Sequence, residues 1–250
     1  MQLKQFFKTN PRIAVAFSGG VDSSYLLYAA DEAGCNVHAY FIKSEFQPQF
    51  ELGEAINFTK SLDIPLTVET FKVLENPNIA GNPPERCYHC KTIFLEKLWK
   101  LARADGFTVL CDGTNADDDE SDRPGMRALR EQGVLSPLRD CKLGKRKIRA
   151  LSKKAGLPTH AKPAYACLAT RIPTGTEITQ ELLEKVERAE GALFDMGFSD
   201  FRVRLIPPDT AKLQMPEKQW RKAASMRSKI AKALEADFSA IVLDIKPRKG

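Results

Sequence analysis

Histidine is scarce in this chain, which has only three among its 250 residues, namely His38, His89 and His160. A histidine-rich metal cage or a histidine-based triad is therefore not expected, and a metal site would have to use sulfur or carboxylate ligands. Long apolar runs are also missing, because stretches such as Ile13 to Phe17 fall far short of the roughly 18 residues that span a bilayer. The start of the chain lacks the apolar core of a secretory signal. We therefore expect a cytoplasmic protein that does not cross a membrane.

The composition excludes several other classes. Apolar residues make up 43% and charged residues 28% of the chain, which is typical of a globular enzyme and not of a disordered or fibrous protein. In a reducing compartment, the six cysteines are expected to bind metal or to react, not to form disulfides. The net charge of +6 favours anionic partners, and nucleotides, phosphorylated metabolites and RNA are all compatible with it.

Strand and helix patterns alternate along the first part of the chain. The expected strands cover residues 13–17, 36–42, 65–71 and 107–111, and the expected helices cover residues 22–30, 50–62, 87–103 and part of 142–154. This alternation predicts an α/β fold with a doubly wound parallel sheet over residues 1–160. Residues 161–250 form a smaller expected α+β domain, with helices over 179–196 and 217–236 and strands over 201–206, 210–215 and 240–245. Residues 75–85 are expected to form a loop.

The turn after the first expected strand carries the strongest local motif, Ser18-Gly-Gly-Val-Asp-Ser-Ser24. Its glycines let backbone N–H groups curl around phosphate oxygens, and the helix that follows directs its positive end at them. The spacing matches neither the Walker A loop nor the dinucleotide fingerprint. It matches the PP-loop of the ATP pyrophosphatases, enzymes that cleave ATP between the α and β phosphates and transfer AMP to an acceptor.

Two charged segments stand later in the chain. Six carboxylates crowd residues 112–122, at the carboxyl end of an expected strand, where ligands collect in open α/β sheets. For Asp119, Glu120 and Asp122, a solvated turn is an equal alternative. Residues 142–154 carry seven basic residues and no acidic one, and we interpret them as a solvated helix face because no RNA-binding motif or interleaved aromatic residue accompanies them.

Three of the cysteines form a candidate metal site. Cys87 and Cys90 are spaced as C-x-x-C, which lets two thiolates converge on one metal, and Cys167 supplies a third sulfur if the fold brings it near. Three thiolates indicate either a [4Fe–4S] cluster with one open iron or a zinc site completed by His89 or another ligand. Buried structural cysteines are the plain alternative, which we prefer for Cys35, Cys111 and Cys141.

Taken together, these motifs resemble the LarE family of PP-loop sulfur transferases over nearly the whole chain. The segments that carry the resemblance are 18–24, Arg86-Cys-Tyr-His-Cys-Lys91, 112–118, 123–125, 136–138, 156–158, 162–163, Ala166-Cys-Leu-Ala-Thr-Arg171 and Phe201-Arg-Val-Arg204. The family adenylates a carboxylate of pyridinium-3,5-biscarboxylic acid mononucleotide and converts it to a thiocarboxylate. In one branch a single cysteine gives up its own sulfur, and in another three cysteines hold a [4Fe–4S] cluster that carries the sulfide. Because all three cysteines are present, the resemblance implies the cluster branch, with Cys167 also at the catalytic position.

The resemblance implies roles for further residues. ATP phosphates and the departing pyrophosphate, with Mg²⁺ neutralising charge, would be bound by Ser18, Gly19, Gly20, Asp22, Ser23 and Ser24. The cofactor-binding set includes a second group at the carboxyl end of an expected strand, which is Gly113, Thr114, Asn115 and Asp118. The nucleotide-binding set also includes Arg171, Arg202 and Arg204, of which the last two alternate along a strand, share one face and could clamp a substrate phosphate. The implied partners are a small nucleotide substrate, a sulfide donor and further copies of the chain in a homo-oligomer, and a nucleic acid is not expected.

The chain departs from the family pattern at Lys212 and Gln214, where a charged Arg and Glu pair is expected. Two rival functions stay open. One is a tRNA thiolase of the same superfamily, and the other is a zinc-stapled adenine-nucleotide sensor without catalysis.

Overall fold

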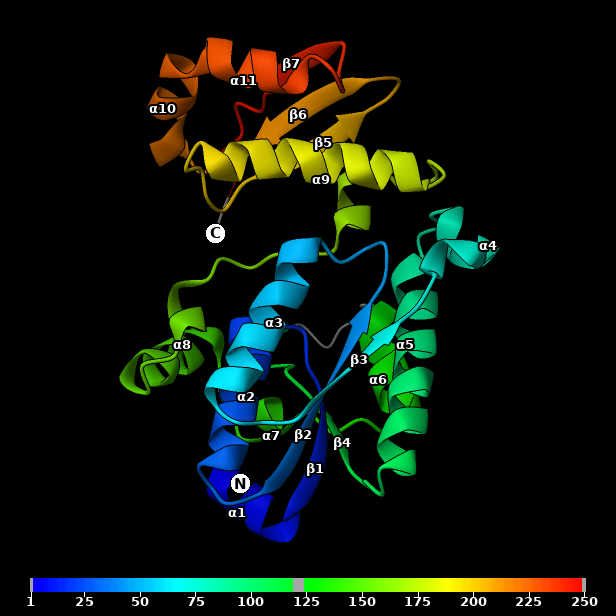
Figure 1. Cartoon of the computed structure of the whole chain (residues 1–250), viewed down its shortest axis with the longest axis vertical. Coiled ribbons are helices and arrows are strands. Elements are labelled where there is room, and N and C mark those ends of the chain that lie inside the picture. The colour runs from blue at the N-terminus through cyan, green and yellow to red at the C-terminus, as the bar shows by residue number, and fades with distance from the viewer. Residues whose placement is uncertain (1, 119–123, 249–250) are drawn as a thin grey trace. The chain divides into compact units, whose positions relative to one another are not determined.

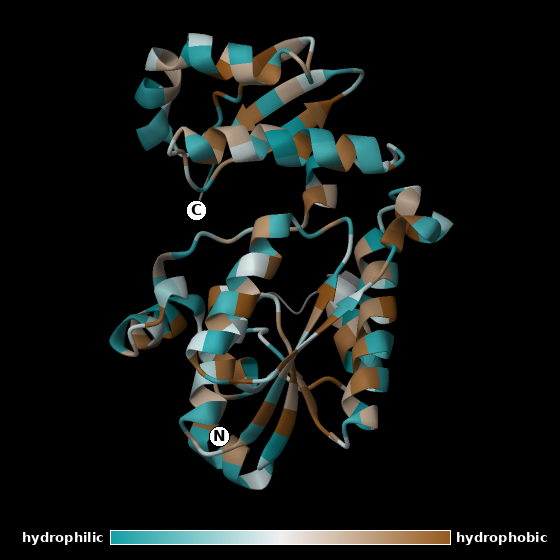
Figure 2. Ribbon diagram, viewed as in Figure 1, coloured by the Kyte–Doolittle hydropathy of each residue, from teal (hydrophilic) through white to brown (hydrophobic). Residues whose placement is uncertain are grey.

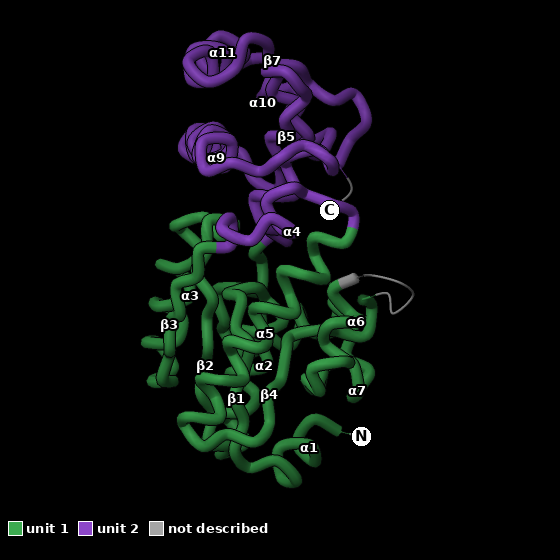
Figure 3. Tube along the Cα trace, turned by 90° about the vertical axis from the view of Figure 1, so that its right-hand side faces the viewer, with its two compact units in different colours: residues 1–72, 85–162 green, residues 73–84, 163–250 purple. Residues whose placement is uncertain are grey.

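The computed structural model describes residues 2–118 and 124–248, and the chain divides into two compact units (Figure 3). Unit 1 comprises residues 1–72 and 85–162, and unit 2 comprises residues 73–84 and 163–250. The sequence places the division at 160/161. In the structure it falls two residues later, and the segment 73–84 groups with unit 2 although its neighbours on both sides belong to unit 1.

Unit 1 contains a parallel sheet of four strands in the order β3-β2-β1-β4. The strands are β1 (Arg12–Ala16), β2 (Asn36–Lys43), β3 (Leu66–Thr70) and β4 (Leu110–Asp112). In the register, Ile13 lies opposite Val37, and Val15 lies opposite both Ala39 and Cys111. The chain builds outward from β1 to β3 and then returns to the other side of β1, so the order reverses between β1 and β4. Ligands of open α/β sheets bind at this switch point, beyond the carboxyl ends of the two strands.

Helices cover both faces of this sheet (Figure 1). The helices of unit 1 are α1 (Leu3–Thr9), α2 (Val21–Asp31), α3 (Gln49–Ser61), α5 (Arg86–Ala104), α6 (Pro124–Glu131), α7 (Pro137–Asp140) and α8 (Lys145–Lys154). Alternate strand residues face opposite ways, so that Val15 and Phe41 pack in one apolar cluster with α2 and α3, while Ala14 and Tyr40 pack in another with α5 and α6. The predicted doubly wound α/β fold is confirmed. Within the described residues, no helix is long and apolar enough to cross a membrane.

Unit 2 contains a mixed sheet of three strands, β5 (Arg202–Ile206), β6 (Thr210–Gln214) and β7 (Ala240–Leu243). β5 and β6 are antiparallel, and β7 is parallel to β6. The helices of this unit are α4 (Pro77–Ala80), α9 (Gln180–Asp195), α10 (Trp220–Ser225) and α11 (Arg227–Leu234), with short 3₁₀ turns at Val73–Glu75, Leu168–Arg171 and Glu217–Gln219. Side chains such as Leu193, Val203 and Leu213 form its core, which Figure 2 shows as apolar segments on the facing elements. The small C-terminal α+β unit is therefore confirmed as well.

Two expected elements differ in the structure. The single helix expected over 217–236 is broken at Met226, whose backbone leaves the helical region (φ −100°, ψ 9°). Ala223 of α10 and Leu234 of α11, on either side of this break, both pack in the core of unit 2. Residues 75–85, expected as a loop, contain α4, where the Asn76 side chain accepts a hydrogen bond from the Asn78 amide at 3.0 Å.

Candidate active site

The Ser18–Gly20 turn connects β1 directly to α2 and folds over the first turn of that helix. The Ser18 amide donates to Ser23 Oγ at 3.3 Å, and the two serine hydroxyl oxygens lie 3.1 Å apart. Gly19 has φ +69°, a conformation that a side chain strains. The free N–H groups at the start of α2 therefore face the turn, as an anion site requires.

The loop after β4 comes into direct contact with the first turn of α2 through Gly113. A Cβ atom built on Gly113 would lie 2.7 Å from the Ser23 nitrogen and 3.0 Å from Ser23 Cα, so no side chain fits there. The structure thus brings two of the predicted nucleotide-binding segments, 18–24 and 113–118, together at the switch point of the sheet.

Asp112, the last residue of β4, organises the acidic loop. Its carboxylate accepts hydrogen bonds from Ser136 Oγ at 2.7 Å, from the Thr114 amide at 3.2 Å and from the Thr114 hydroxyl. The Lys91 ammonium of α5 lies 3.9 Å from the same carboxylate, and burial lowers the pKa of Lys91. The sequence alone did not single out Asp112 or Lys91, although both stand inside the quoted motifs.

Farther along this loop, Asn115 and Asp118 fix each other. The Asn115 amide donates to Asp118 Oδ2 at 2.9 Å, and Asn115 Oδ1 accepts from the Asp117 amide at 2.9 Å. The side chains of Thr114 and Asn115 are buried. The remaining acidic residues expected here, Asp119, Glu120 and Asp122, lie outside the described residues.

Two basic residues of α8 turn toward the site. Lys145 pairs with Asp22, and Arg149 donates to the carbonyl oxygens of His160 at 2.6 Å and Lys162 at 2.8 Å. The interpretation of this segment as a solvated face holds for its exposed members, which are Lys142, Arg146, Lys147, Lys153 and Lys154. For Lys145 and Arg149 the interpretation as a solvated face is wrong. Their spacing next to buried Ile148 is the feature of the sequence that could have indicated their contacts with the rest of unit 1.

The two carboxylate oxygens of Asp22 differ in their contacts. Oδ2 contacts Lys145, whereas Oδ1 is buried and has no hydrogen-bond partner among the described residues. Burial raises the pKa of Asp22, and the Lys145 ammonium opposes that shift. An unpartnered carboxylate oxygen beside a phosphate-binding turn fits the oxygen ligands that Mg²⁺ prefers.

The three candidate metal ligands are divided between the units. Cys87 and Cys90 lie in the first turn of α5 in unit 1, and Cys167 lies in unit 2, directly before the Leu168–Arg171 turn. Cys87 is exposed, the other two are half-buried, and Arg86 donates to Cys87 Sγ at 3.6 Å. In the described part of the chain, neither unit by itself gathers three His, Cys, Asp or Glu side chains that could hold a metal ion. The site with three sulfurs therefore stays a prediction.

The other three cysteines have a different environment. Cys35 and Cys111 are buried, and Cys141 is half-buried. Burial raises the pKa of all three thiols, which disfavours the thiolate that binds metals or attacks substrates. This supports their interpretation as structural residues.

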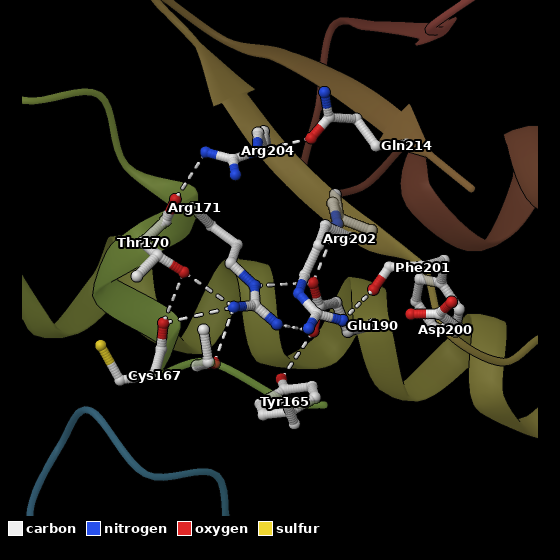
Figure 4. A network of polar contacts seen from close by, with 12 residues as sticks. Tyr165, Cys167, Thr170, Arg171, Glu190, Asp200, Phe201, Arg202, Arg204 and Gln214 are labelled. Atoms are coloured by element: carbon white, nitrogen blue, oxygen red, sulfur yellow. Dashed lines mark hydrogen bonds and ion pairs between the residues drawn. The ribbon is translucent and has the colours of Figure 1, made fainter. Parts of the chain in front are cut away.

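A buried polar network surrounds the Cys167 segment in unit 2 (Figure 4). Arg171 is 1% exposed and forms a two-point ion pair with Glu190, with both N–O distances at 2.9 Å. Its remaining donors reach the carbonyl oxygens of Ala166 at 2.7 Å and Cys167 at 3.2 Å. Figure 4 shows the Cys167 sulfur directed away from this network. Arg171 was predicted to bind the nucleotide, and this geometry favours instead a role in positioning the backbone of Cys167.

Arg202 and Arg204 of β5 both face the segment that carries Cys167. Arg202 donates to the Ala164 carbonyl oxygen, and Arg204 Nη1 donates to the Thr170 carbonyl oxygen at 2.9 Å. The prediction that both lie on one strand face is confirmed, and their role as a phosphate clamp stays a prediction. Burial lowers the pKa of Arg202 to about 10 and also lowers that of Arg204.

The unusual residues of β6 are integrated into the same strand face. Gln214 Oε1 accepts from Arg204 at 2.6 Å, and Gln214 Nε2 donates to Asp244 at 2.8 Å. The Lys212 ammonium lies 3.4 Å from the Asp244 carboxylate. Asp244 therefore supplies the negative charge that the sequence lacks at position 214.

The chain is similar in sequence to several known proteins. A model of the tRNA methyl transferase HUP domain matches residues 11–121. An uncharacterized protein of Synechocystis sp. is 38% identical over 218 residues, which cover 87% of this chain and 81% of the relative. An uncharacterized protein of Methanocaldococcus jannaschii is 38% identical over 205 residues, or 81% of this chain and 77% of the relative.

A third relative carries a functional name. The pyridinium-3,5-bisthiocarboxylic acid mononucleotide synthase of Lactiplantibacillus plantarum is 31% identical over 237 residues, which cover 94% of this chain and 86% of that enzyme. The chain belongs to the family of this synthase. The resemblance to the LarE family is thus confirmed for the family, with unit 1 as an ATP-binding HUP domain, and the cluster-dependent branch stays a prediction.

Proposed function

We propose that this LarE-family protein is an AMP-forming sulfurtransferase. It adenylates a carboxylate of pyridinium-3,5-biscarboxylic acid mononucleotide and converts it to a thiocarboxylate. The observation that carries the proposal is the contact between Gly113 and Ser23, in the first turn of α2 directly after the Ser18–Gly20 turn, beside the Asp22 oxygen that has no partner among the described residues. The name of the 31% identical relative supports the choice of substrate.

Unit 1 performs the activation step. The N–H groups at the start of α2 would bind the phosphate oxygens, and Asp22 would hold the Mg²⁺ that neutralises part of their charge. The substrate carboxylate attacks the α phosphorus, and the bond between that phosphorus and the oxygen bridging to the β phosphate breaks. Pyrophosphate leaves, and the carboxylate oxygen becomes part of AMP, which is a better leaving group.

The sulfur transfer depends on Cys87, Cys90 and Cys167. These thiolates would hold a [4Fe–4S] cluster, which supplies the sulfur atom when it is bound. Their exposed or half-buried side chains fit a ligand set better than the three thiols whose pKa burial raises. Arg171 and Glu190 hold the Cys167 backbone, while Arg202 and Arg204 offer two guanidinium groups for the substrate phosphate.

A product assay tests the activation step. The full chain is prepared anaerobically and incubated with ATP, Mg²⁺ and the biscarboxylic mononucleotide. We expect AMP and pyrophosphate in equal amounts and a product whose mass reflects the exchange of one oxygen for one sulfur. Formation of ADP and phosphate, or absence of any substrate-dependent pyrophosphate, contradicts the proposal.

Cysteine variants test the sulfur step. Cys87→Ser, Cys90→Ser and Cys167→Ser are expected to lose iron and acid-labile sulfide, whereas the matched control Cys141→Ser retains both. An iron-free wild-type protein that loses one sulfur from Cys167 in each turnover would show a sacrificial mechanism. Zinc in place of iron, without pyrophosphate release, would indicate the nucleotide sensor.

One observation favours a second candidate, a tRNA thiolase. The five exposed basic residues of the 142–154 segment have no ion pair among the described residues, and the matching domain model is named for a tRNA enzyme. Binding of tRNA that weakens steeply with salt, together with no turnover of the mononucleotide, would establish it in place of the first proposal.

A further inference from the structure

Lys162 is the last residue of unit 1 and lies on the PP-loop turn. Its ammonium donates to the Gly19 carbonyl oxygen at 3.1 Å and pairs with the Glu54 carboxylate of α3. A Cβ atom on Gly19 would stand 3.7 Å from the Glu51 carbonyl oxygen and 4.0 Å from Lys162 Nζ, so the turn is flanked by α3 and by this lysine. A cation thus lies against the anion-binding turn and is paired with a carboxylate.

The backbone of Lys162 is held in place by Arg149. The guanidinium of Arg149 donates to the carbonyl oxygens of His160 and Lys162, and α8, which carries Arg149, is anchored by buried Ile148 and Ser152. Because only the backbone is fixed in this way, the long side chain of Lys162 can exchange partners while its root stays beside the turn. Arg149 acts as a positioning residue.

The present partner of Lys162 is a weak one. The side chain of Glu54 is 52% exposed, and that of Lys162 is 16% exposed, so solvent screens the pair. Phosphate oxygens bound at the turn would offer the same ammonium charge-assisted hydrogen bonds to a group of higher negative charge. The exchange from carboxylate to phosphate is therefore favourable.

We propose that Lys162 is a further phosphate-binding residue of the ATP site and that Glu54 competes for it when no nucleotide is bound. This inference rests on the proposed ATP site and adds a residue pair to it.

Binding of a non-hydrolysable ATP analogue with Mg²⁺, measured by calorimetry, tests the inference. Lys162→Ala is expected to weaken binding about tenfold, as loss of a charge-assisted contact implies. Glu54→Gln is expected to strengthen binding about two- to fivefold, because it removes the competing charge. The matched controls Lys60→Ala, on α3, and Asp31→Asn, on α2, change exposed residues and leave the affinity unchanged.

Lys162→Ala is expected to weaken binding and Glu54→Gln to strengthen it. These opposite effects distinguish competition for the Lys162 ammonium from a merely structural role of the pair. Unchanged or weaker binding by Glu54→Gln overturns the competition, and unchanged binding by Lys162→Ala overturns the phosphate contact. Failure of the wild-type protein to bind the analogue overturns the ATP site itself. Thermal unfolding of each variant identifies misfolding, and Lys162→Arg, which keeps the charge, restores most of the affinity. Deuterium uptake over residues 160–166 is expected to respond to the analogue in wild type and in Lys60→Ala, but not in Lys162→Ala.

Discussion

Each unit places a carboxylate beside a cation, and the two carboxylates, a half-buried one in unit 1 and a buried one in unit 2, differ in how many of their oxygens accept hydrogen bonds. In unit 2, both oxygens of Glu190 are bonded, by Arg171, by the Tyr165 hydroxyl at 2.6 Å and by the Val203 amide at 2.9 Å. In unit 1, Asp22 has Lys145 on one oxygen and no partner among the described residues on the other. A satisfied buried carboxylate holds structure together, whereas an unsatisfied one is available for a ligand at a cost in stability.

The difference extends to the way each region is built. The nucleotide site of unit 1 uses backbone groups and the absence of side chains at Gly19 and Gly113, so a short motif encodes most of it. The arginine network of unit 2 joins side chains from a 3₁₀ turn, a helix and a strand around Glu190. The predictions below test this contrast, beginning with the largest expected effect.

Loss of the satisfied carboxylate should be the most damaging change. Glu190→Gln leaves the Arg171 guanidinium buried without a counter-charge, and we expect the free energy of unfolding of unit 2 to fall by about 3–5 kcal/mol. Denaturant unfolding measures the loss, with Glu181→Gln, an exposed position on the same helix, as the control. An effect below about 1 kcal/mol, the range of exposed ion pairs, would show that the network does not hold the unit together.

One added methyl group should disrupt the close approach of the Gly113 backbone to the Ser23 backbone in unit 1. Gly113→Ala places a Cβ 2.7 Å from the Ser23 nitrogen, so the first turn of α2 must move. Overpacking of this kind costs about 1–3 kcal/mol, and we expect a loss of at least about tenfold in ATP affinity. Gly53→Ala, within α3, meets no atom within 4 Å and serves as the control, which should keep the affinity. Equal ATP binding by both variants would contradict the proposed approach.

Removal of the unsatisfied carboxylate of Asp22 should raise the free energy of unfolding and lower the activity. The folded-state pKa of Asp22 is raised, so the folded state binds its proton more tightly than the unfolded chain does, and the free energy of unfolding falls as the pH rises through that raised value. Asp22→Asn removes this penalty and should stabilise unit 1 at neutral pH by at most about 1 kcal/mol, allowing for solvent screening. Thermal unfolding and pyrophosphate release are measured together. Retained pyrophosphate release would exclude the Mg²⁺ role of Asp22.

His38 provides the smallest test, because it is a titratable group outside both sites. Its ring nitrogen contacts Thr67 Oγ1 at 2.8 Å, and burial lowers its pKa below the ordinary 6.5, with Asp105 opposing the shift. As the pH falls through about 6.5, the unfolded chain therefore takes up a proton that the folded chain does not, and the free energy of unfolding decreases. We expect His38→Gln to flatten this part of the stability profile. An unchanged profile would assign the pH dependence to other groups.

Local patterns were enough to predict most of the fold. The alternation of apolar runs with amphipathic helices gave the strands of unit 1 to within a few residues, and the two-residue period of β5 placed Arg202 and Arg204 on one face. The division of helix 217–236 at Met226 was not predicted, because the helical period of the sequence continues through it. The grouping of residues 73–84 with unit 2 has its origin in contacts distant along the chain, such as the bond from Gly175 N to the Asn82 carbonyl oxygen at 2.9 Å.

The sequence by itself determined the doubly wound fold and the PP-loop turn, because each depends on residues close together in the chain. Only the tertiary structure decided which charged side chains contact the nucleotide turn or pair with one another. It turned Lys145, Arg149 and Lys162 toward the nucleotide turn, and it paired Arg171 with Glu190, 19 residues away. The physical reason is that the free energy of a charged side chain depends on burial and on its partners, and both are set by segments that meet only after folding.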